Sequence, residues 1–229
     1  MENPPLLVVC DLDRFEVRTN QRIENRRAAY AERWWLHVEP RSGMRAKLAP
    51  LARYIATPRL TKHRLFVWLS LDTLPDSQVI VIARDDDFTF GVLHSRVHEL
   101  WARATGTQLR EYESGFRYTP TTTFETFPFP EATSEQEAAI DSVVQRLLFL
   151  RNGWLSTPGP TEDGEERTLT TLYNRRYTWL QQAHAKLDVA VLAAYGWPDS
   201  LSDDQILARL LELNLARSGA TVATAGGAA

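Results

Sequence analysis

The stretch Phe124-Glu-Thr-Phe-Pro-Phe-Pro130 constrains the fold more than any other feature of the sequence. Proline lacks an N–H and disfavours helix at the residue before it, so two prolines two positions apart exclude a helix here. The three phenylalanines predict an extended segment anchored to a hydrophobic core. Strand patterns precede this stretch and helical patterns follow it, so we expect two modules that meet near residue 130.

Strand patterns dominate the chain before this point. The apolar run 6–10 predicts a buried strand, and the alternation at 15–19 predicts a second strand that forms a hairpin with it. A helix over 24–36 and a turn over 40–43 are expected next. Further strands are expected at 55–57, 65–69, 79–83 and 88–93, followed by a helix at 94–105 and a long polar loop at 106–123.

Helical patterns dominate after it. Ser134 to Glu137 fits a capping box and is followed by an apolar stripe to Leu150. A second amphipathic helix is expected over 178–195, and a third begins after a capping box at Ser202. The fold class is therefore α+β. The expected domains are a strand pair over 1–20, a β-rich module over 21–130, a small helical module over 131–217 and a disordered tail over 218–229.

Charge is unevenly distributed along the chain. The window from Arg22 to Arg64 holds eleven Lys and Arg against three Glu, a net charge of +8, whereas the whole chain carries −3. The rest of the chain therefore carries −11, and the basic block is a candidate phosphate-binding surface. A single cysteine excludes an internal disulfide and suits the cytoplasm. No apolar run approaches the ~20 residues of a membrane helix.

Two motifs suggest catalysis but lack the residues that would support it. Asn3-Pro4-Pro5 is similar to the active-site turn of DNA amino-methyltransferases, yet Leu6 stands where an aromatic ring would stack on the flipped base. No Gly-rich loop for a methyl donor follows a strand. His94 and His98 have the i, i+4 spacing of a metal pair but lack a third ligand, so we expect surface or half-buried histidines.

A haloacid-dehalogenase-like phosphohydrolase is the enzymatic alternative. Asp11 and Asp13 follow the first strand and Asp85 follows a later one, as carboxylates that hold Mg²⁺ would. Arg14 and Phe15 occupy the place of the expected tight turn, and the long helical insert is missing. Aspartates are common in turns at strand ends, which explains the pattern without catalysis.

Two clusters suit DNA recognition. The first, at 59–64, is basic and suits phosphate contacts. The second lies in the polar loop, where Arg can read guanine and Glu can accept from cytosine. The phosphate candidates are Arg59, Lys62, His63 and Arg64, and the base-reading candidates are Arg110, Glu111, Arg117 and Tyr118. From composition alone, an ordinary polar loop is the better explanation.

Several stretches resemble the target-recognition and helical region of fused adenine-specific DNA methyltransferases of the type IIL restriction–modification kind. They are Arg53-Tyr-Ile-Ala-Thr-Pro-Arg-Leu-Thr-Lys-His-Arg64, Phe90-Gly-Val-Leu-His-Ser-Arg-Val-His-Glu-Leu-Trp101, Arg117-Tyr-Thr-Pro120 with Phe124 to Pro130, Leu169-Thr-Thr-Leu-Tyr-Asn174 and Trp179-Leu-Gln-Gln-Ala-His184. The resemblance implies target recognition in the β-rich module, with double-stranded DNA as the partner.

Such relatives carry a nuclease-like domain and a methyltransferase domain that uses S-adenosylmethionine. This sequence lacks both methyltransferase motifs, so we expect no catalytic residue and no cofactor in this chain, and a separate methyltransferase subunit becomes a candidate partner. Residues 3–20 resemble a strand pair of the nuclease-like domain, which suggests an internal deletion near Asn20. A non-functional remnant is a further alternative.

Overall fold

The computed structural model describes residues 6–11, 14–19, 41–73, 75–108 and 115–225, and divides into compact units over 1–45 and 46–229. In the first unit, strands β1 (Leu6–Asp11) and β2 (Arg14–Thr19) pair antiparallel, with Val8 opposite Val17. The hairpin expected from the sequence is confirmed. The helix expected over 24–36 lies outside the described residues.

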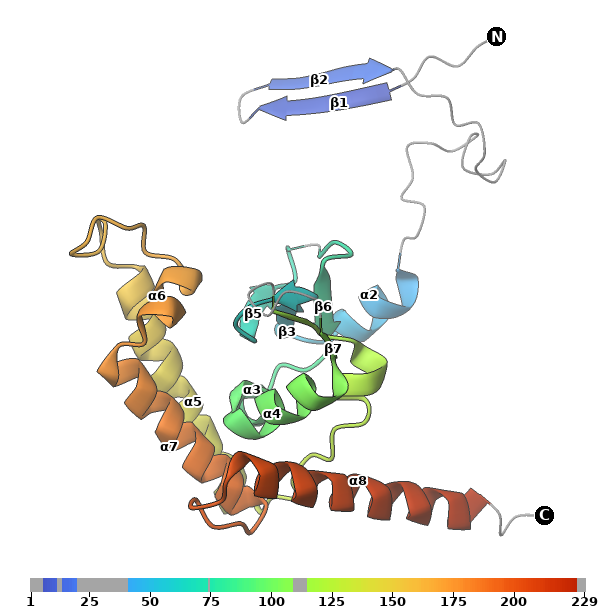
Figure 1. Cartoon of the computed structure of the whole chain (residues 1–229). Coiled ribbons are helices and arrows are strands. Elements are labelled where there is room, and N and C mark those ends of the chain that lie inside the picture. The colour runs from blue at the N-terminus through green and yellow to red at the C-terminus, as the bar shows by residue number, and fades with distance from the viewer. Residues whose placement is uncertain (1–5, 12–13, 20–40, 74, 109–114, 226–229) are drawn as a thin grey trace. The chain divides into compact units, whose positions relative to one another are not determined.

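Helix α2 (Ser42–Leu48) begins within the stretch 40–43 where a turn was expected. It is followed by a three-stranded antiparallel sheet in the order β5-β3-β6. The central strand β3 (Arg53–Pro58) pairs with β5 (Val67–Ser70) and β6 (Val79–Ile82), so Ile55 lies between Trp68 and Ile82. Figure 1 shows this sheet above α3 (Asp87–His94) and α4 (Arg96–Thr105). The three strands expected here are confirmed.

A second, smaller sheet is built from strands of two residues each. Its order is β4 (Leu60–Thr61), β8 (Phe116–Arg117) and β7 (Thr107–Gln108), all antiparallel. A π-helical turn, η2 (Pro120–Phe124), follows β8. The expected polar loop is thus a hairpin whose stem is fixed to β4.

The strand expected at 88–93 is wrong, because these residues lie in helix α3 (Asp87–His94). Asp86 begins the helix, since its carboxylate accepts a hydrogen bond of 2.7 Å from the backbone N–H of Thr89. Its middle is apolar on every side because α3 is buried between the sheet and α5. A Cβ at Gly91 would lie 2.6 Å from side-chain carbons of Ile140 and Val144, so the two helices approach closely there.

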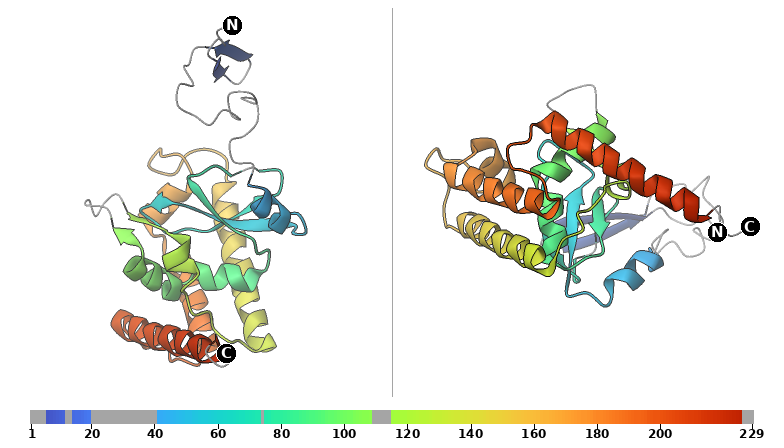
Figure 2. Two further views of the ribbon diagram at one scale, coloured as in Figure 1. Left: turned by 90° about the vertical axis from the view of Figure 1, so that its right-hand side faces the viewer. Right: turned by 90° about the horizontal axis from the view of Figure 1, so that it is seen from below.

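The helical region begins after Pro130, as the sequence predicts. Its helices are α5 (Ser134–Leu155), α6 (Leu169–Arg175), α7 (Thr178–Ala194) and α8 (Asp203–Ala225). The first capping box uses Thr133 and Gln136, one residue earlier than expected. Helices α5 and α7 lie side by side against α3 (Figures 1 and 2). Helix α8 continues past Ser218, where a tail was expected.

One hydrophobic core joins the sheet to the helices. Ile55 of β3, Phe90 of α3, Val144 of α5 and Leu187 of α7 all belong to the same buried cluster. Phe127 is also buried and its ring lies 4.5 Å from that of His98, so the Phe-Pro stretch is anchored as predicted. Residues 51–131 and the helices that follow them therefore share their packing. Helix α4 (Arg96–Thr105) ends at Gly106, as expected.

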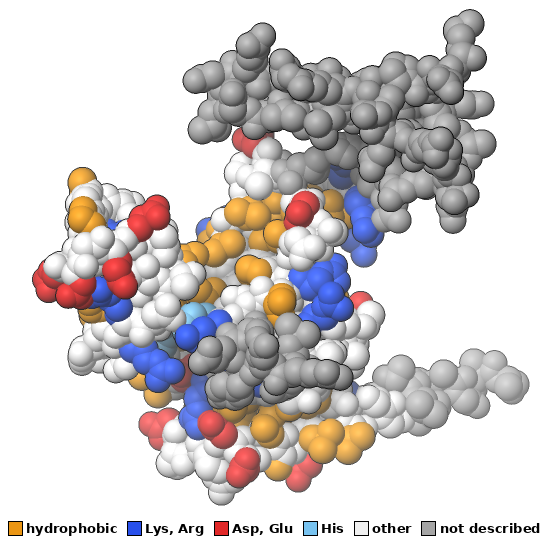
Figure 3. Space-filling model, turned by 45° about the horizontal axis from the view of Figure 1, so that its top comes forward, with side chains coloured by type: hydrophobic (Ala, Val, Ile, Leu, Met, Phe, Trp, Pro, Cys, Tyr) orange, Lys and Arg blue, Asp and Glu red, His pale blue; other side chains and the backbone are white. Residues whose placement is uncertain are grey.

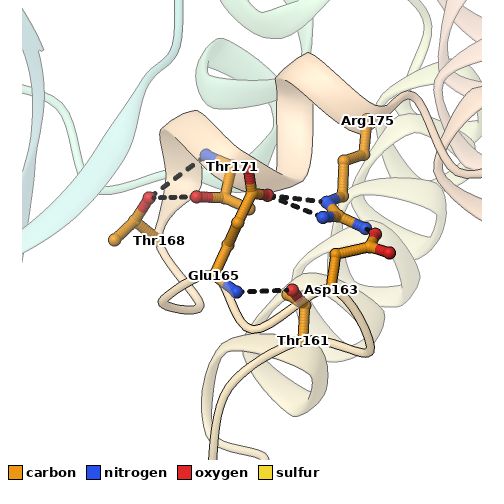
Figure 4. A network of polar contacts seen from close by, with 6 residues as sticks. All are labelled: Thr161, Asp163, Glu165, Thr168, Thr171 and Arg175. Atoms are coloured by element: carbon orange, nitrogen blue, oxygen red, sulfur yellow. Dashed lines mark hydrogen bonds and ion pairs between the residues drawn. The ribbon is translucent and has the colours of Figure 1, made fainter.

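Arg175 fixes the loop between α5 and α6. Its guanidinium forms ion pairs with Asp163 and Glu165, while Thr161 accepts from the backbone N–H of Glu165 (Figure 4). Thr168 caps α6 by accepting from the N–H of Thr171. This network folds the acidic loop back onto the helix that follows it. No described helix is long and apolar enough to cross a membrane.

Candidate nucleic-acid interface

Strand β8 presents Arg117 to solvent. Leu60 is opposite Arg117 and Thr61 is opposite Phe116 in the ladder between β4 and β8. Side chains alternate between the two faces of a strand, so the burial of Phe116 in the core leaves Arg117 exposed. Its guanidinium has no hydrogen bond or ion pair with another described residue. The Arg117 side chain is therefore exposed, and its role as a base reader stays a prediction.

Gly115 sets the approach of the loop to β4. Its φ is +79°, and an added Cβ would lie 2.1 Å from the carbonyl oxygen of Thr61 and 2.6 Å from the backbone nitrogen of Lys62. Only glycine fits such a conformation at such a distance. The end of the loop thus lies directly against the basic segment 59–64. Arg110 and Glu111, the other two charged candidates for base reading, lie outside the described residues.

The basic segment divides into exposed and tethered side chains. Lys62 is exposed and makes no hydrogen bond or ion pair within the described part of the chain. Arg59 is half-buried, and its Nε donates to the carbonyl of Ser77 at 2.9 Å. His63 is also half-buried, and its Nε2 lies 2.8 Å from Oδ1 of Asn174 at the end of α6. Lys62 is the freest of these phosphate candidates.

Arg64 points into the protein, away from the solvent where the sequence placed it. The side chain is 6% exposed. Its Nη1 donates to Oγ1 of Thr57 at 3.0 Å and to the carbonyl of Pro58, and its Nη2 donates to the carbonyl of Phe116 at 3.0 Å. Burial lowers the pKa of Arg64 to about 10, so it stays charged at neutral pH. These contacts give Arg64 a structural role.

Tyr118 is fully buried as well. Its hydroxyl lies 2.9 Å from Nε2 of His98, and burial raises the pKa of the Tyr118 phenol above its ordinary value. The ring packs against Phe66 at 6.1 Å between centroids. The polar and apolar atoms of Tyr118 are thus all engaged within the core, and reading of a base by this ring stays an untested prediction.

The histidines expected at or near the surface are buried instead. The backbone N–H of Phe66 donates to Nδ1 of His94, so the neutral ring carries its proton on Nε2. That nitrogen lies 3.2 Å from the Tyr173 hydroxyl, which in turn lies 2.9 Å from Nε2 of His184. Burial lowers the pKa of all three histidines, His98 to about 3 and His184 to about 4.

A cleft of about 380 Å³ separates the sheet side of this unit from the turn between α6 and α7. Its lining includes Arg64, Arg96 and Arg103 on one side and Arg176 and His184 on the other. Figure 3 shows Lys and Arg side chains around this hollow, with a histidine inside it. Arg96 and Arg103 are neutralised by Asp203 and Glu99.

Arg176 is the functional candidate that sequence reasoning missed. It ends α6 in the left-handed conformation, with φ 50°, and its exposed side chain forms no hydrogen bond or ion pair inside the described ranges. Asn174, two residues before it, is bonded to His63 beside Lys62. The signal in the sequence was the pair Arg175-Arg176, but only the fold shows that one arginine is ion-paired and the other free.

The carboxylates of the phosphohydrolase alternative are taken one at a time, because Asp11 and Asp85 lie in different compact units. Asp85 accepts from the backbone N–H of Ala52 at 3.4 Å, and its carbonyl accepts from the guanidinium of Arg53. Asp11 ends β1, which pairs antiparallel with β2, and Asp13 lies outside the described residues. The position of Asp85 is that of a strand-end turn residue.

Three comparisons with known proteins agree with one another. Residues 51–131 match the family model described as the MmeI target recognition domain. DNA methyltransferase A of Bacillus subtilis (strain 168) is 30% identical over 158 residues, which cover 67% of this chain and 16% of that protein.

The third match is the solved structure of the type IIL restriction–modification enzyme MmeI in complex with DNA. It aligns with a TM-score of 0.63 and 24% identity, covering 73% of this chain and 22% of that one. The resemblance stated from the sequence is thus confirmed for the recognition and helical region, and the α+β fold class with it. The likeness of residues 3–20 to a nuclease-like domain stays a prediction. Residues 51–131 of this chain are thus similar to the MmeI target recognition domain family.

Proposed function

We propose that this chain recognises a specific sequence in double-stranded DNA for an adenine methyltransferase or a restriction–modification system. One observation carries the proposal: a segment that matches the MmeI target recognition domain presents an exposed arginine, Arg117, beside the basic segment 59–64, and Arg117 has no ion pair with another described residue. The relative named as a DNA methyltransferase and the DNA complex of MmeI support it.

In this proposal Arg117 reads a base edge, because a guanidinium can donate two hydrogen bonds to guanine in the major groove. Arg110 and Glu111 remain proposed base readers on the same loop. Arg176, which lines the cleft, and Lys62, the residue before the lining residue His63, contact phosphates, and Arg59 contributes where its tether to Ser77 allows. Phosphate contacts fix the register of the protein on the duplex, and base contacts choose the sequence.

The chemistry would come from elsewhere. The chain spans 16% of the length of the curated relative that it matches, and its sequence carries no motif for a methyl donor. We therefore assign it no cofactor and propose that a separate methyltransferase subunit, acting in the cytoplasm, uses the DNA that this chain selects. A methyl-transfer assay of the chain alone with labelled S-adenosylmethionine should give no signal.

The proposal is tested by binding of the full chain to a pool of randomised duplexes at several salt concentrations. Affinity should fall linearly with salt on logarithmic axes, because phosphate contacts release counterions. Arg117→Ala should cost about 1–3 kcal/mol and relax the preference at one base pair. Lys186→Ala is the matched control.

Lys186 suits this control because it lies on the opposite face of α7 from His184 and Asp188, which line the cleft. Its loss should leave both affinity and preference unchanged. Binding that does not respond to salt, or an Arg117→Ala variant that weakens every sequence equally, would contradict the assignment.

A further inference from the structure

Arg64 connects the end of β3 to β8, the strand that carries Arg117. Its guanidinium donates to Thr57 and Pro58 at the end of β3 and to the carbonyl of Phe116 in β8. Thr57 and Pro58 are seven and six residues away in the sequence, whereas Phe116 is 52 residues away, so the side chain bridges distant parts of the chain. A planar guanidinium offers several donors in a fixed geometry, which suits such a bridge.

The same guanidinium holds the ring of Phe116. The Cζ atom of Arg64 lies 4.7 Å from the ring centroid, and that of Arg103 lies 5.1 Å from it. Arg103 is itself held by the carboxylate of Glu99, at 2.6 Å and 2.9 Å. Contacts of a cation with an aromatic face gain strength when they are shielded from water. Phe116 is therefore fixed by two cations, and its burial faces Arg117 outward.

The ladder itself is too short to fix this arrangement. Strands β4 and β8 share only two residue pairs, and such short pairing is marginal in water. A slip of one residue would exchange the faces of Phe116 and Arg117. On its other side β8 pairs with β7 over two further residue pairs. At the β4 side it is also held by the bond from the Tyr118 N–H to the carbonyl of Arg59, at 2.8 Å, and by Arg64.

We propose that Arg64 is a positioning residue for target recognition: it fixes the register of β8 on β4 and thereby the direction of Arg117, without touching DNA. The inference deepens the proposed function and rests on it for the link to base preference. It also departs from the phosphate contact expected from the sequence, and the two roles predict different measurements.

The first experiment needs no DNA. Hydrogen exchange of the full chain is measured for the Tyr118 amide in Arg64→Gln and Arg64→Lys. Arg64→Gln should speed exchange at this amide about tenfold or more, while amides of α5 and α7 keep their protection. Arg64→Lys retains the charge, so its exchange rate at Tyr118 should lie between those of the wild type and Arg64→Gln.

Unchanged protection at Tyr118 in folded Arg64→Gln would overturn the proposal. Loss of protection over the whole unit would also overturn it, because Arg64 would then be a general core residue. If Arg64→Gln does not fold, Thr57→Val removes one acceptor at similar volume and should speed the same amide by a smaller factor.

The second experiment selects bound duplexes from a randomised pool. Arg64→Gln should keep the salt dependence of the wild type but flatten the preference about tenfold at the base pair affected by Arg117→Ala. The double variant should show no further loss at that base pair. Lys62→Ala is the contrast, since it should weaken all sequences and reduce the salt slope by about one.

An Arg64→Gln variant that behaves as Lys62→Ala does would restore the phosphate role and overturn the positioning role. A wild-type chain without salt-dependent binding would defeat the proposed function instead. The exchange experiment would still decide in that case whether Arg64 holds β8.

Discussion

Single residues show most clearly where the structure differs from what the sequence pattern predicts. Arg64 and Lys62 are two residues apart in one basic segment, yet Lys62 is exposed and Arg64 is 6% exposed. Charge pattern identifies the segment, but it cannot tell which cation finds carbonyl acceptors inside the fold. The same holds for Arg175 and Arg176, of which one is held by Asp163 and Glu165.

The buried histidines make stability depend on pH. Their folded pKa values lie below the ordinary 6.5, so the unfolded chain binds more protons than the folded chain below that pH. The free energy of unfolding should therefore fall as pH drops from about 6.5 toward 4. Burial raises the pKa of Asp188 to about 6, which opposes part of this loss because protonation below pH 6 favours the folded state.

Urea unfolding at pH 7.5 and pH 5 measures this effect, and the midpoint should be lower at pH 5. His184→Gln can keep a hydrogen bond with Tyr173, and it removes one titrating group that faces His94 and Arg151. Its stability should depend less on pH, by up to about 1.4 kcal/mol per pH unit. Equal pH dependence in both proteins would show that His184 is not buried neutral.

Gly115 gives a second prediction at this scale. Gly115→Ala adds backbone strain at positive φ and a clash with the carbonyl of Thr61, so it should lower the free energy of unfolding by about 2 kcal/mol or more. Gly159→Ala is the control, since φ is +84° there but no atom lies within 4 Å of the added Cβ. It should cost about 1 kcal/mol. If thermal unfolding showed that Gly115→Ala and Gly159→Ala lose the same stability, the contact of residue 115 with Thr61 would not contribute to the loss.

Among the elements, α3 was misread because its pattern is ambiguous. Phe88 to Leu93 is a short apolar run, and such a run fits a buried strand as well as a helix that is buried on all sides. The deciding feature is the cap at Asp86, whose carboxylate accepts from the N–H of Thr89 and starts a helix. The strands β3, β5 and β6 were predictable because each is bounded by proline or turn residues. The contact of α3 with α5 was not, because it depends on residues some fifty positions away.

The contact of α3 with α5 can be tested at Gly91. Ala is the better helix former, but its Cβ would meet Ile140 and Val144 at 2.6 Å. Overpacking should win, so Gly91→Ala should destabilise by about 1–3 kcal/mol. Gly153→Ala in α5 has open space and should stabilise by up to about 1 kcal/mol. If Gly91→Ala and Gly153→Ala changed the free energy of unfolding in the same direction in denaturant, the close approach of α3 to α5 would be contradicted.

At the scale of the whole molecule, the segment matched by the family model is smaller than the folding unit. The match covers 51–131, but the core that contains Phe90 also contains Val144 and Leu187. The sequence predicted the change of texture near Pro130 and the helical region beyond it. It could not show that both sides of Pro130 pack into one core, since that follows from side chains far apart in the chain.

A fragment of residues 46–131 should therefore not fold alone, because it would expose the face of α3 that α5 and α7 cover. A fragment of residues 46–217 keeps these helices and should fold cooperatively. Circular dichroism with thermal melting compares the two. A sharp unfolding transition in the shorter fragment would show that the helices are dispensable.

The close approach at Gly91 bears on how such proteins could trade specificities. An exchange of recognition segments between relatives that cuts at residue 131 would pair one parent's α3 with the other parent's Ile140 and Val144. A parent with a larger residue at position 91 would need smaller residues at positions 140 and 144. Productive recombination points should thus lie beyond α7, so that a chimera inherits residues 51–131 and the helices packed against α3 from the same parent.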